Sequence, residues 1–451
     1  MGIMLNRRKL LLASTALAGP ALLLAACGTA PQTAAPEGPP RKAGEKVTLR
    51  HTPWQGAPSR AAQTAVVEDW NKRHPDVQVV EELPPGESSL YQKLLIQAAA
   101  GQLPDLSFMQ GSADYVSFVS KGLLLPIEDF IKRDRTFNAK ERLQPRSRDV
   151  VEMLGHTWAL PVEAGTLVVF FNKNHFEEAG VPLPRRGWTW DDLLDRARKL
   201  TRQGETARFG YGQGNGFGRV EPWIVQNGTR VLDKVSFPTK AQLDAPDVVS
   251  ALQYVHDLVW KHRVMPTAQM QPSAFQQATG LWQGDQSMRQ EGIWLVPDVA
   301  KNMKSPWGIA PLPKGKREAA QIQINVNVAF QTTKYPADCF EFLKFINNEG
   351  QKHMIELWGR MPVTLNEEHK QTFVRFLKNS TIDDWQIAWE TWESGYSQHM
   401  TPAWPDLERD VLTPAITALL GPNGGGASAA TVLKELAPKA QQIITAAGAA
   451  K

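Results

Sequence analysis

The sequence contains very few cysteines. It has two in 451 residues, Cys27 near the N-terminus and Cys339 far along the chain. Cys339 lies among apolar residues at helical spacing, which predicts a small core side chain. Two cysteines so far apart do not form the dense framework of a small disulfide-stabilised domain.

The chain also lacks a strong net charge. Its formal net charge is +4, and Arg7, Arg8 and Lys9 supply three of the positive charges. Without that N-terminal cluster the chain carries about +1, with acidic and basic residues interspersed. This balance argues against nucleic acid, or a polybasic membrane patch, as the main partner.

Motifs for metal, nucleotide and acyl-transfer chemistry are missing as well. The nine histidines form no His-x-x-x-His pair and there is no cysteine cluster, so we expect neither a metal site nor a cofactor. The glycine-rich run from Gly210 to Gly218 predicts a mobile loop, because no capped helix follows at the offset of a nucleotide-binding loop. No Gly-x-Ser-x-Gly elbow occurs.

A glycoside hydrolase needs two carboxylates that face each other across a cleft. A sequence alone does not place such a pair, so this enzyme class stays open as an alternative.

The N-terminal 26 residues have the three parts of a secretory signal peptide. Arg7-Arg8-Lys9 form a positive cluster, an uncharged stretch runs from Leu10 to Leu24, and small residues lead to Cys27. The uncharged stretch is short for a spanning helix, which needs about 20 residues. Leu24-Ala25-Ala26-Cys27 resembles a bacterial lipobox, in which cleavage before the cysteine accompanies acylation of its thiol. The resemblance predicts that residues 1–26 are removed and that lipid on Cys27 anchors the exported protein at the bacterial cell envelope.

Two alternatives stay open at the N-terminus. An ordinary uncleaved membrane anchor also explains the apolar stretch. Asn6-Arg7-Arg8-Lys9 and the leucines behind it resemble a twin-arginine export signal, whereas paired basic residues are common in all signal peptides. A lipid-modified Cys27 is not available for a disulfide, so Cys339 has no partner and no structural disulfide is expected.

A flexible tether and two domains are predicted behind Cys27. Residues 27–46 are dominated by proline, alanine, glycine and glutamine and show no apolar period, which is typical of a tether. The chain from Val47 onward has about 405 residues, more than one hydrophobic core usually serves. We therefore expect two domains.

The first part of the folded region alternates predicted strands and helices. Apolar spacing and turn residues indicate strands at 47–51, 77–80 and 106–109. A helix through Val66 and Trp70 separates the first two strands, and a second helix from Leu90 ends before Gly101. This order of elements is that of an open α/β sheet with a parallel core.

The same order resumes further along the chain. Residues 166–171 predict a buried strand, and Thr189-Trp190-Asp191-Asp192 forms a capping box that opens a helix. Three later helices are expected at 248–261, 337–347 and about 429–446. A flexible loop is expected at 421–426, before the last of them. Trp385, Trp389 and Trp392 fall at helical spacing, and such a stripe is more often core than binding surface.

Several short sequence blocks follow one another between residues 47 and 440, and their order and spacing are informative. They are Trp70-Asn71-Lys72-Arg73-His74-Pro75-Asp76, Gly101-Gln102-Leu103-Pro104-Asp105, Leu160-Pro161-Val162-Glu163-Ala164-Gly165, Gly292-Ile293-Trp294, Trp307-Gly308-Ile309-Ala310-Pro311-Leu312-Pro313 and Gly359-Arg360-Met361-Pro362. No single block is diagnostic. Together they resemble the extracellular solute-binding protein family 1, the sugar-binding components of ABC importers, and this resemblance agrees with a lipid anchor.

The resemblance implies a periplasmic-binding-protein-like α/β fold, in which two lobes joined by a multi-strand hinge close around a ligand. It places lobe one at 47–160 plus 300–360 and lobe two at 161–299, with the C-terminal helices of 361–451 packing across both. It also implies a monomeric, non-enzymatic receptor that delivers a sugar, expected to be an oligosaccharide, to an ABC permease. A lipid-anchored glycoside hydrolase is the alternative.

Three residues lead the candidates for ligand contact. A sugar site needs aromatic rings for the apolar faces of the sugar, and carboxylates, amides or guanidinium groups for its hydroxyls. The family motif suggests Glu163, which lies between two predicted strand segments, as the carboxylate and Trp294 as the stacking ring. Arg360 offers a planar fork for two hydroxyls. Two of them have a structural alternative, which is a solvated loop acid for Glu163 and a core ring for Trp294.

The remaining candidates are expected in loops after predicted strands or near the crossing between the two lobes. They are Trp54, Asp105, Gln110 with the adjacent Gly111 and Ser112, Trp223, Asn227, Asn325, Asn327 and Trp404. Asp105 has an alternative role, because it can organise the turn that it follows. Asn325 and Asn327 share one face of an alternating strand, where a pair of short polar side chains is unusual.

Other ligands are weighed against the sugar within the same binding class. Ferric-ion binders usually carry paired tyrosines where this chain has Phe170-Phe171. A phosphate-bearing ligand needs a basic or amide-rich cradle, which the sequence does not identify. The carbohydrate interpretation leads, and a glycerophosphodiester or another polar solute stays open.

Overall fold

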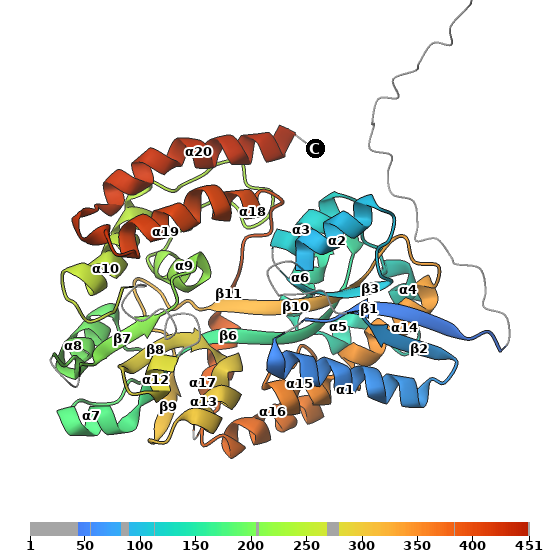
Figure 1. Ribbon diagram of the computed structural model, residues 1–451, viewed down its shortest axis with the longest axis horizontal. Coiled ribbons are helices and arrows are strands. Elements are labelled where there is room, and N and C mark those ends of the chain that lie inside the picture. Colours follow the sequence, from blue (N-terminus) through green and yellow to red (C-terminus); the bar gives the residue numbers. More distant parts are fainter. Residues whose placement is uncertain are drawn as a thin grey trace, which may run out of the picture. The chain divides into compact units, whose positions relative to one another are not determined.

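The computed structural model describes residues 44–54, 56–82, 90–111, 113–203, 207–267, 279–382 and 384–449. Within these residues nine strands form one mixed sheet (Figure 1). The main path of the sheet has the order β2-β1-β3-β10-β6-β8-β7, while β11 pairs with β10 and β9 pairs with β6. Helices pack on this sheet, which confirms the expected α/β fold class.

The first three strands of the chain pair in parallel, as expected. β1 (Val47–Thr52) lies between β2 (Val77–Glu81) and β3 (Leu106–Gln110). The connections are α1 (Ala57–Arg73) and α2 (Leu90–Ala99), which lie on opposite faces of these strands in Figure 1 and belong to different apolar clusters. The apolar periods of this region predicted its strand–helix order correctly.

The centre of the sheet is antiparallel, which corrects the expectation of a parallel core. β10 (Gln321–Ala329) runs antiparallel to both β3 and β6 (Leu160–Asn172). That expectation came from the alternation of strands and helices near the N-terminus. Local alternation does not reveal that a strand from a distant part of the chain inserts next to β3.

β6 is one unbroken strand of 13 residues. Glu163 therefore lies inside a strand, whereas the sequence suggested two segments with Glu163 between them. The first half of β6, up to Thr166, pairs with β10, and the second half, from Leu167, pairs with β8 and β9. β6 thus passes from one group of strands into the other, and the β10 register shifts between Asn325 and Val326 on the way.

The second group of strands contains β7 (Phe209–Gln213), β8 (Gln286–Gly292) and β9 (Trp307–Ala310). β7 and β8 are parallel, and β8 and β9 are both antiparallel to β6. The short strand β11 (Tyr396–Ser397) pairs in parallel with the start of β10. The C-terminal part of the chain therefore returns to the middle of the sheet.

The glycine-rich run is not a loop over its length, which corrects the prediction made for it. Gly210 and Gly212 lie within β7, and α9 (Phe217–Gln226) begins inside the run and contains Gly218. A Cβ atom at Gly210 would stand 2.0 Å from the carbonyl oxygen of Ala197, and one at Gly212 would stand 2.3 Å from the Gln286 amide. The glycines are needed because neighbouring groups approach the strand closely.

The expected later helices are present. The capping box at Thr189 opens α8 with both reciprocal hydrogen bonds in place. The three helices predicted at 248–261, 337–347 and about 429–446 are α10, α14 and α20. The segment 421–426, predicted as a loop, ends in a short 3-10 turn at Gly424–Gly426.

The remaining elements are short strands and helices that connect and cover the sheet. They are β4 (Glu152–Met153), β5 (His156–Thr157), α3 (Ala113–Ser120), α4 (Glu128–Arg133), α5 (Ala139–Arg142), α6 (Pro145–Val151), α7 (Lys173–Ala179), α8 (Trp190–Leu200), α10 (Pro246–Trp260), α12 (Thr279–Trp282), α13 (Val296–Asn302), α14 (Pro336–Asn347), α15 (Gln351–Trp358), α16 (Glu367–Asn379), α17 (Gln386–Ser394), α18 (Trp404–Leu407), α19 (Thr413–Leu420) and α20 (Ala429–Ala449). A π-helical turn, Glu408–Leu412, joins α18 to α19.

Most buried apolar side chains of the described chain fall into three clusters. One joins β7, β8 and α8 to α10 with the C-terminal helices α18 to α20. Cys339 belongs to the cluster around β1 and α1; it is fully buried with a free thiol, as predicted, and burial raises the pKa of that thiol. Trp392 is buried, and Trp385 and Trp389 pack partly buried against the same cluster, which confirms this stripe as core.

Some predictions fall on residues outside the described ranges. They concern the signal peptide, Cys27 and most of the tether, and also Ser112. The division of the chain into two lobes stays a prediction. In the described part of the chain, none of the helices combines the length and the apolar character that crossing a bilayer requires.

Candidate functional site

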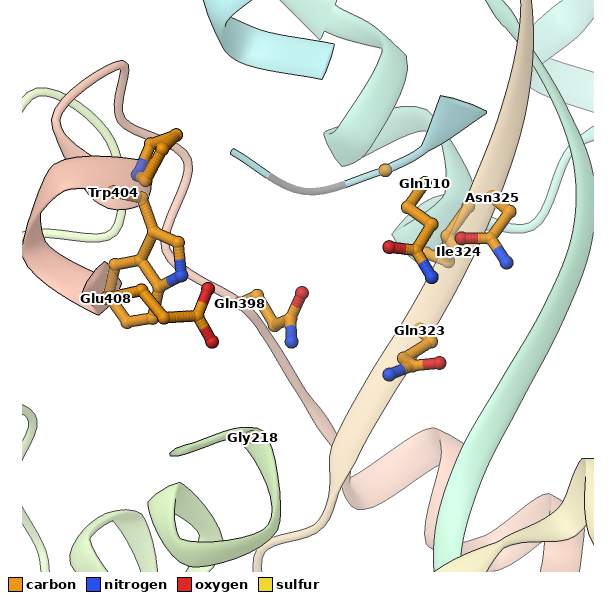
Figure 2. A pocket seen from close by; sticks show the side chains of 10 residues that line it. Gln110, Gly218, Gln323, Ile324, Asn325, Gln398, Trp404 and Glu408 are labelled. Carbon is orange, nitrogen blue, oxygen red and sulfur yellow. The ribbon is translucent and has the colours of Figure 1, made fainter. Parts of the chain in front are cut away.

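A polar cavity of about 200 Å³ lies where β10, β3, α9 and α18 meet (Figure 2). Its walls come from distant parts of the chain, which are brought together by the pairing of β3 with β10 and by the return of the C-terminal segment. The lining residues are Gln110, Gly111, Gly218, Gln323, Ile324, Asn325, Gln398, Trp404, Pro405 and Glu408.

One wall is formed by alternating side chains of β10. Gln323 and Asn325 both line the cavity, because residues two apart on a strand project on the same side. Figure 2 shows the Gln323 amide directed into the open space and the Asn325 amide close to β6. Asn325 donates its amide N–H to a carboxylate oxygen of Glu163. Gln323 thus offers a free donor and acceptor, and Asn325 is already engaged on one side.

The end of β3 continues this wall. The backbone N–H of Gln110 donates to the Tyr91 hydroxyl at 2.9 Å, and that of Gly111 donates to the Ile324 carbonyl at 3.0 Å. A Cβ atom at Gly111 would stand 2.0 Å from the same carbonyl oxygen. The sequence places glycine here because only a residue without a side chain allows this contact. These bonds leave the Gln110 side chain directed toward the cavity (Figure 2).

The opposite wall carries the aromatic ring and the only charged group among the described lining residues. Trp404 is buried with 7% of its surface exposed, and its ring stacks on His399 with centroids 5.1 Å apart. Its side chain also donates a hydrogen bond to Glu408. Burial raises the pKa of Glu408, and the Trp404 hydrogen bond opposes this shift. Gln398 lies between this wall and the β10 wall in Figure 2.

The chemistry of the lining is therefore amide-rich and almost uncharged. Three glutamines and one asparagine supply both donors and acceptors, whereas no lysine or arginine is found among the described lining residues. Such a lining suits a neutral ligand with many hydroxyl groups. It offers nothing to neutralise an anion.

Glu163 and Arg360, two leading sequence candidates, lie behind Asn325. Glu163 is fully buried, and its Oε2 is 3.2 Å from the Arg360 Nε. Burial raises the pKa of Glu163, while the Arg360 charge and the Asn325 hydrogen bond oppose that shift. Burial also lowers the pKa of Arg360, and Glu163 opposes that shift. This ion pair holds Asn325 in place from the rear of the wall.

Trp294 lies next to the same ion pair. Its ring is 4.9 Å from the guanidinium carbon of Arg360 and 5.3 Å from that of Arg219. A Cβ atom at Gly165 would stand 2.7 Å from the ring, and one at Gly292 would stand 2.0 Å from it. The two glycines therefore make room for Trp294 between the strands, and two cations stabilise its ring.

The other sequence candidates have partners within the protein. Trp54 is half-buried, with its ring 5.8 Å from Phe108. Asp105 accepts hydrogen bonds from the Thr333 hydroxyl at 2.6 Å and from the Arg50 backbone at 2.9 Å, which fits its alternative role in organising the turn.

Three further candidates also lie away from the cavity. Asn327 contacts the His51 ring nitrogen at 3.1 Å. Trp223 is buried in the cluster around α8 to α10, and Asn227 donates to the Asp247 carbonyl at 2.7 Å. Of the candidates for ligand contact that lie in the described residues, Gln110, Gly111, Asn325 and Trp404 line the cavity. Ligand contact by the others stays a prediction.

Sequence reasoning missed six cavity residues, namely Gly218, Gln323, Ile324, Gln398, Pro405 and Glu408. For Gln323 a signal was present, because amides alternate along β10 at positions 321, 323, 325 and 327. Only the last two were singled out. Gln398 and Glu408 reach the cavity through long-range packing, and no local pattern marks them.

A mixed α/β sheet of two strand groups joined by one continuous strand, with a polar cavity beside β3 and β10, is the architecture of a periplasmic-binding-protein-like molecule. The profile of the bacterial extracellular solute-binding protein family matches residues 54–353. The chain therefore belongs to this family, as its sequence blocks suggested.

Curated relatives are similar at low identity. A maltotriose-binding protein of Pyrococcus abyssi is 26% identical over 55% of this chain and 50% of its own length. An arabinooligosaccharide-binding protein of Bacillus subtilis is 26% identical over 66% of this chain and 69% of its own length. The match thus spans about half of the first relative and about two thirds of the second.

Solved structures are similar over most of the chain. An ABC substrate-binding protein from Listeria monocytogenes, in complex with cycloalternan, has a TM-score of 0.80 at 21% identity and covers 89% of this chain and 100% of its own. UgpB from Mycobacterium tuberculosis, in complex with glycerophosphocholine, has a TM-score of 0.76 at 16% identity and covers 88% and 98%. At these identities the similarity establishes the fold.

Proposed function

We propose that this chain is the substrate-binding component of an ABC importer and that its cavity binds a neutral carbohydrate, most simply an oligosaccharide. The observation that carries the proposal is the lining of four amide side chains and an aromatic ring, with one carboxylate and no cation among the described residues. Each neutral hydrogen bond contributes about 0.5–1.5 kcal/mol net. Several amides that bind at once are therefore needed for micromolar affinity, which corresponds to about −8 kcal/mol.

The names of the relatives support a carbohydrate over the other candidates. Maltotriose and arabinooligosaccharides are both neutral and rich in hydroxyl groups, as the lining requires. A glycerophosphodiester carries a negative charge, and the described lining offers it no lysine or arginine. This argues against the phosphodiester alternative, although a protein of this fold binds glycerophosphocholine.

The enzyme alternative receives no support from the cavity. Glycoside hydrolases act with two carboxylates that flank the scissile bond. Among the described lining residues only Glu408 carries a carboxylate. We infer that the chain is a non-enzymatic binder, so that an oligosaccharide incubated with it should be recovered uncleaved.

We also propose that the two lobes expected from the sequence close around the ligand. Lobe one would comprise 47–160 plus 300–360, lobe two 161–299, and the helices of 361–451 would pack across both. The continuous passage of β6 between two groups of strands supports a hinge of this kind. Ligand contacts on both sides would stabilise the closed form, which a permease can distinguish from the open form.

The location and partners complete the proposal. The family is extracellular by its description, and the lipobox-like segment supports a lipid anchor on Cys27 at the bacterial cell envelope. We propose that the protein acts as a monomer with an ABC permease, without a cofactor and without nucleic acid. Cys27 lies outside the described residues, so this part of the proposal rests on the sequence.

The binding site can be tested with Gln323, whose amide projects into the cavity without an assigned partner. Maltotriose and arabinotriose are added separately, and the melting temperature of the protein is followed. We expect at least one sugar to raise the melting temperature of the wild type. Gln323→Ala should weaken that binding about tenfold, because one good hydrogen bond to a buried ligand is lost.

Gln371 provides the matched control, since it is an exposed glutamine on α16. Gln371→Ala should bind like the wild type. Glycerophosphocholine is tested alongside the sugars, and a shift with this compound alone would contradict the carbohydrate proposal. Equal affinity of the Gln323→Ala variant and the wild type would place the sugar elsewhere.

A further inference from the structure

A buried acid lies directly behind the Trp404 wall of the cavity. Glu221 is on α9, and 1% of its surface is exposed. Its Oε1 is 3.6 Å from the Nε2 of His399, which is also 1% exposed. Neither atom has a hydrogen-bond partner among the described residues. Two buried polar atoms that face each other in this way require an explanation.

The other bonds of His399 determine where its proton lies. The Nδ1 of His399 is 3.2 Å from the backbone carbonyl oxygen of Lys234. A carbonyl only accepts, so Nδ1 must carry the hydrogen and donate it. A neutral imidazole has one N–H, which leaves Nε2 with a lone pair and no hydrogen, 3.6 Å from the Glu221 Oε1. Burial lowers the pKa of His399 to about 3, and the Arg230 charge adds to this shift, so the neutral form is the stable one.

The other bonds of Glu221 determine where a proton would sit on it. Its Oε2 accepts from the Tyr396 hydroxyl at 3.4 Å and from the Gln321 amide at 3.3 Å. Oε2 is therefore the acceptor oxygen, and Oε1 faces the lone pair of His399. An ionised Oε1 would repel that lone pair, whereas a protonated Oε1 has an acceptor in front of it.

The charges around Glu221 favour the neutral acid. Burial raises the pKa of Glu221 to about 7; Arg230, Tyr396 and Gln321 oppose the shift, and the nearby Glu408 charge adds to it. Arg230 is itself engaged, since its guanidinium lies 4.9 Å from the Tyr396 ring centre and donates to the Ser397 carbonyl. No single cation is therefore bonded to the Glu221 carboxyl in the described structure.

The pair is connected to the cavity through two lining residues. His399 stacks on the ring of Trp404 and directly follows Gln398 in the chain. Gly218 lines the cavity one turn before Glu221 on α9, and a Cβ atom there would stand 3.3 Å from the Gln321 amide and 3.6 Å from the Gln398 amide. A displacement of His399 would thus move the wall that carries Trp404.

We propose that Glu221 holds a proton up to neutral pH, that Oε1 directs it across the 3.6 Å gap toward the lone pair of the His399 Nε2, and that this neutral pair positions Gln398 and Trp404 in the cavity wall. Above neutral pH the proton leaves to solvent, and the carboxylate and the imidazole lone pair repel each other. The segment 398–408 then loosens, and the cavity loses its aromatic wall. Glu221 and His399 are positioning residues in this scheme. The inference is relevant to transport only if the cavity is the proposed binding site, although its test does not need a ligand.

The test compares the wild type with Glu221→Gln by hydrogen exchange of the segment 398–408. Glutamine imitates the protonated acid, because its amide oxygen accepts from Tyr396 and Gln321 and its N–H₂ faces His399. About one pH unit above the Glu221 midpoint, about nine tenths of the wild type has lost this proton, so the protected amides of its segment should exchange at least about tenfold faster than those of Glu221→Gln at the same pH. About one unit below the midpoint the two proteins should exchange alike.

Glu435→Gln is the matched control, since Glu435 is exposed on α20. It should keep the pH dependence of the wild type. Equal exchange of the wild type and Glu221→Gln at both pH values would overturn the proposal. No oligosaccharide is added, so a failure to find a sugar ligand leaves the result decisive.

A second measurement tests the proposal on the wild type, in case Glu221→Gln does not fold. Nitrogen-15 spectra of histidine-labelled wild type should show one neutral imidazole whose Nε2 resonance changes around pH 7 without the ring becoming protonated, as Glu221 ionises. His399→Gln identifies that resonance by its loss. If the resonance of His399 shows no such change, or shows protonation of the ring, the shared proton does not exist.

Discussion

Individual side chains divide the region of the cavity into two layers with different electrostatic character. On the side of β3 and β10, the polar side chains that face the cavity are amides, which need no counter-ion and can donate and accept at the same time. The layer behind it contains the charged groups Glu163 and Arg360, which neutralise each other out of contact with water. Breaking such a buried pair by removing one partner leaves an unpaired charge and is strongly destabilising. The pair therefore supports Asn325 from behind.

The proton on Glu221 has a consequence for stability that can be measured without reference to the cavity. The pKa of Glu221 is about 7 in the folded protein and 4.5 in an ordinary glutamate. Below pH 4.5 the acid is neutral in both the folded and the unfolded protein, so it does not lower the free energy of unfolding. As the pH rises from 4.5 to 7 the unfolded state ionises first, so the folded protein loses stability, and the full loss is present above pH 7.

We therefore expect Glu221→Gln to become more stable relative to the wild type as the pH rises. A difference of 2.5 units between the two pKa values corresponds to about 3 kcal/mol. The gain in relative unfolding free energy should appear between about pH 5 and pH 8 in urea titrations. Any constant cost of the amide cancels in this comparison. A relative stability that does not change with pH would show that Glu221 is ionised throughout.

At the scale of elements, the predictions that held are those that depend on local sequence. The capping box of α8 illustrates this. The Thr189 hydroxyl accepts from the Asp192 backbone at 3.2 Å, and the Asp192 carboxylate accepts from the Thr189 backbone at 2.9 Å. This backbone hydrogen bond is the largest of the contributions that lower the pKa of Asp192. All the groups lie within four consecutive residues, so the sequence alone specified them.

Thr189→Ala should cost about 1 kcal/mol of unfolding free energy, because one helix N–H loses its acceptor. Thr189→Ser keeps the hydroxyl and should stay within a few tenths of a kcal/mol of the wild type. Urea denaturation of the three proteins at one pH measures both differences. A serine variant that is as unstable as the alanine variant would mean that the methyl group, rather than the cap, stabilises α8.

The elements that sequence reasoning missed depend on contacts between distant residues. β10 joins β3 and β6 in antiparallel orientation, yet its residues are separated from both strands by more than a hundred positions. α9 was missed because its N-terminal glycines resemble a loop, although they fit strand and helix contacts that only the folded chain creates. The candidate site shows the same limit. Its β3 residues could be inferred from a strand end and Asn325 from the alternation along β10, whereas Gln398 and Glu408 could not.

At the scale of the whole molecule, the proposed binding site and the proposed membrane anchor lie in separate parts of the chain. The described residues contain the sheet, the cavity and the buried acid pair, and they carry a free thiol only at the buried Cys339. The proposed lipid site, Cys27, precedes the first described residue by 17 positions. Binding and attachment should therefore be separable by mutation.

We expect Cys27→Ser to release the protein from the membrane fraction without altering its binding. A lipid-modified cysteine holds the chain at the bilayer through several acyl chains, and serine offers no thiol for the modification. Cys339→Ser is the matched control, because it removes the other thiol from a site buried in the cluster around β1 and α1. The control should stay with the membrane. Cell fractionation measures attachment, and a melting-temperature screen with maltotriose and arabinotriose measures binding.

If Cys27→Ser stayed with the membrane, the apolar N-terminal segment would act as an uncleaved anchor. If it were released but had lost a sugar response that the wild type shows, attachment and binding would be coupled in a way that the separation of Cys27 from the cavity does not explain.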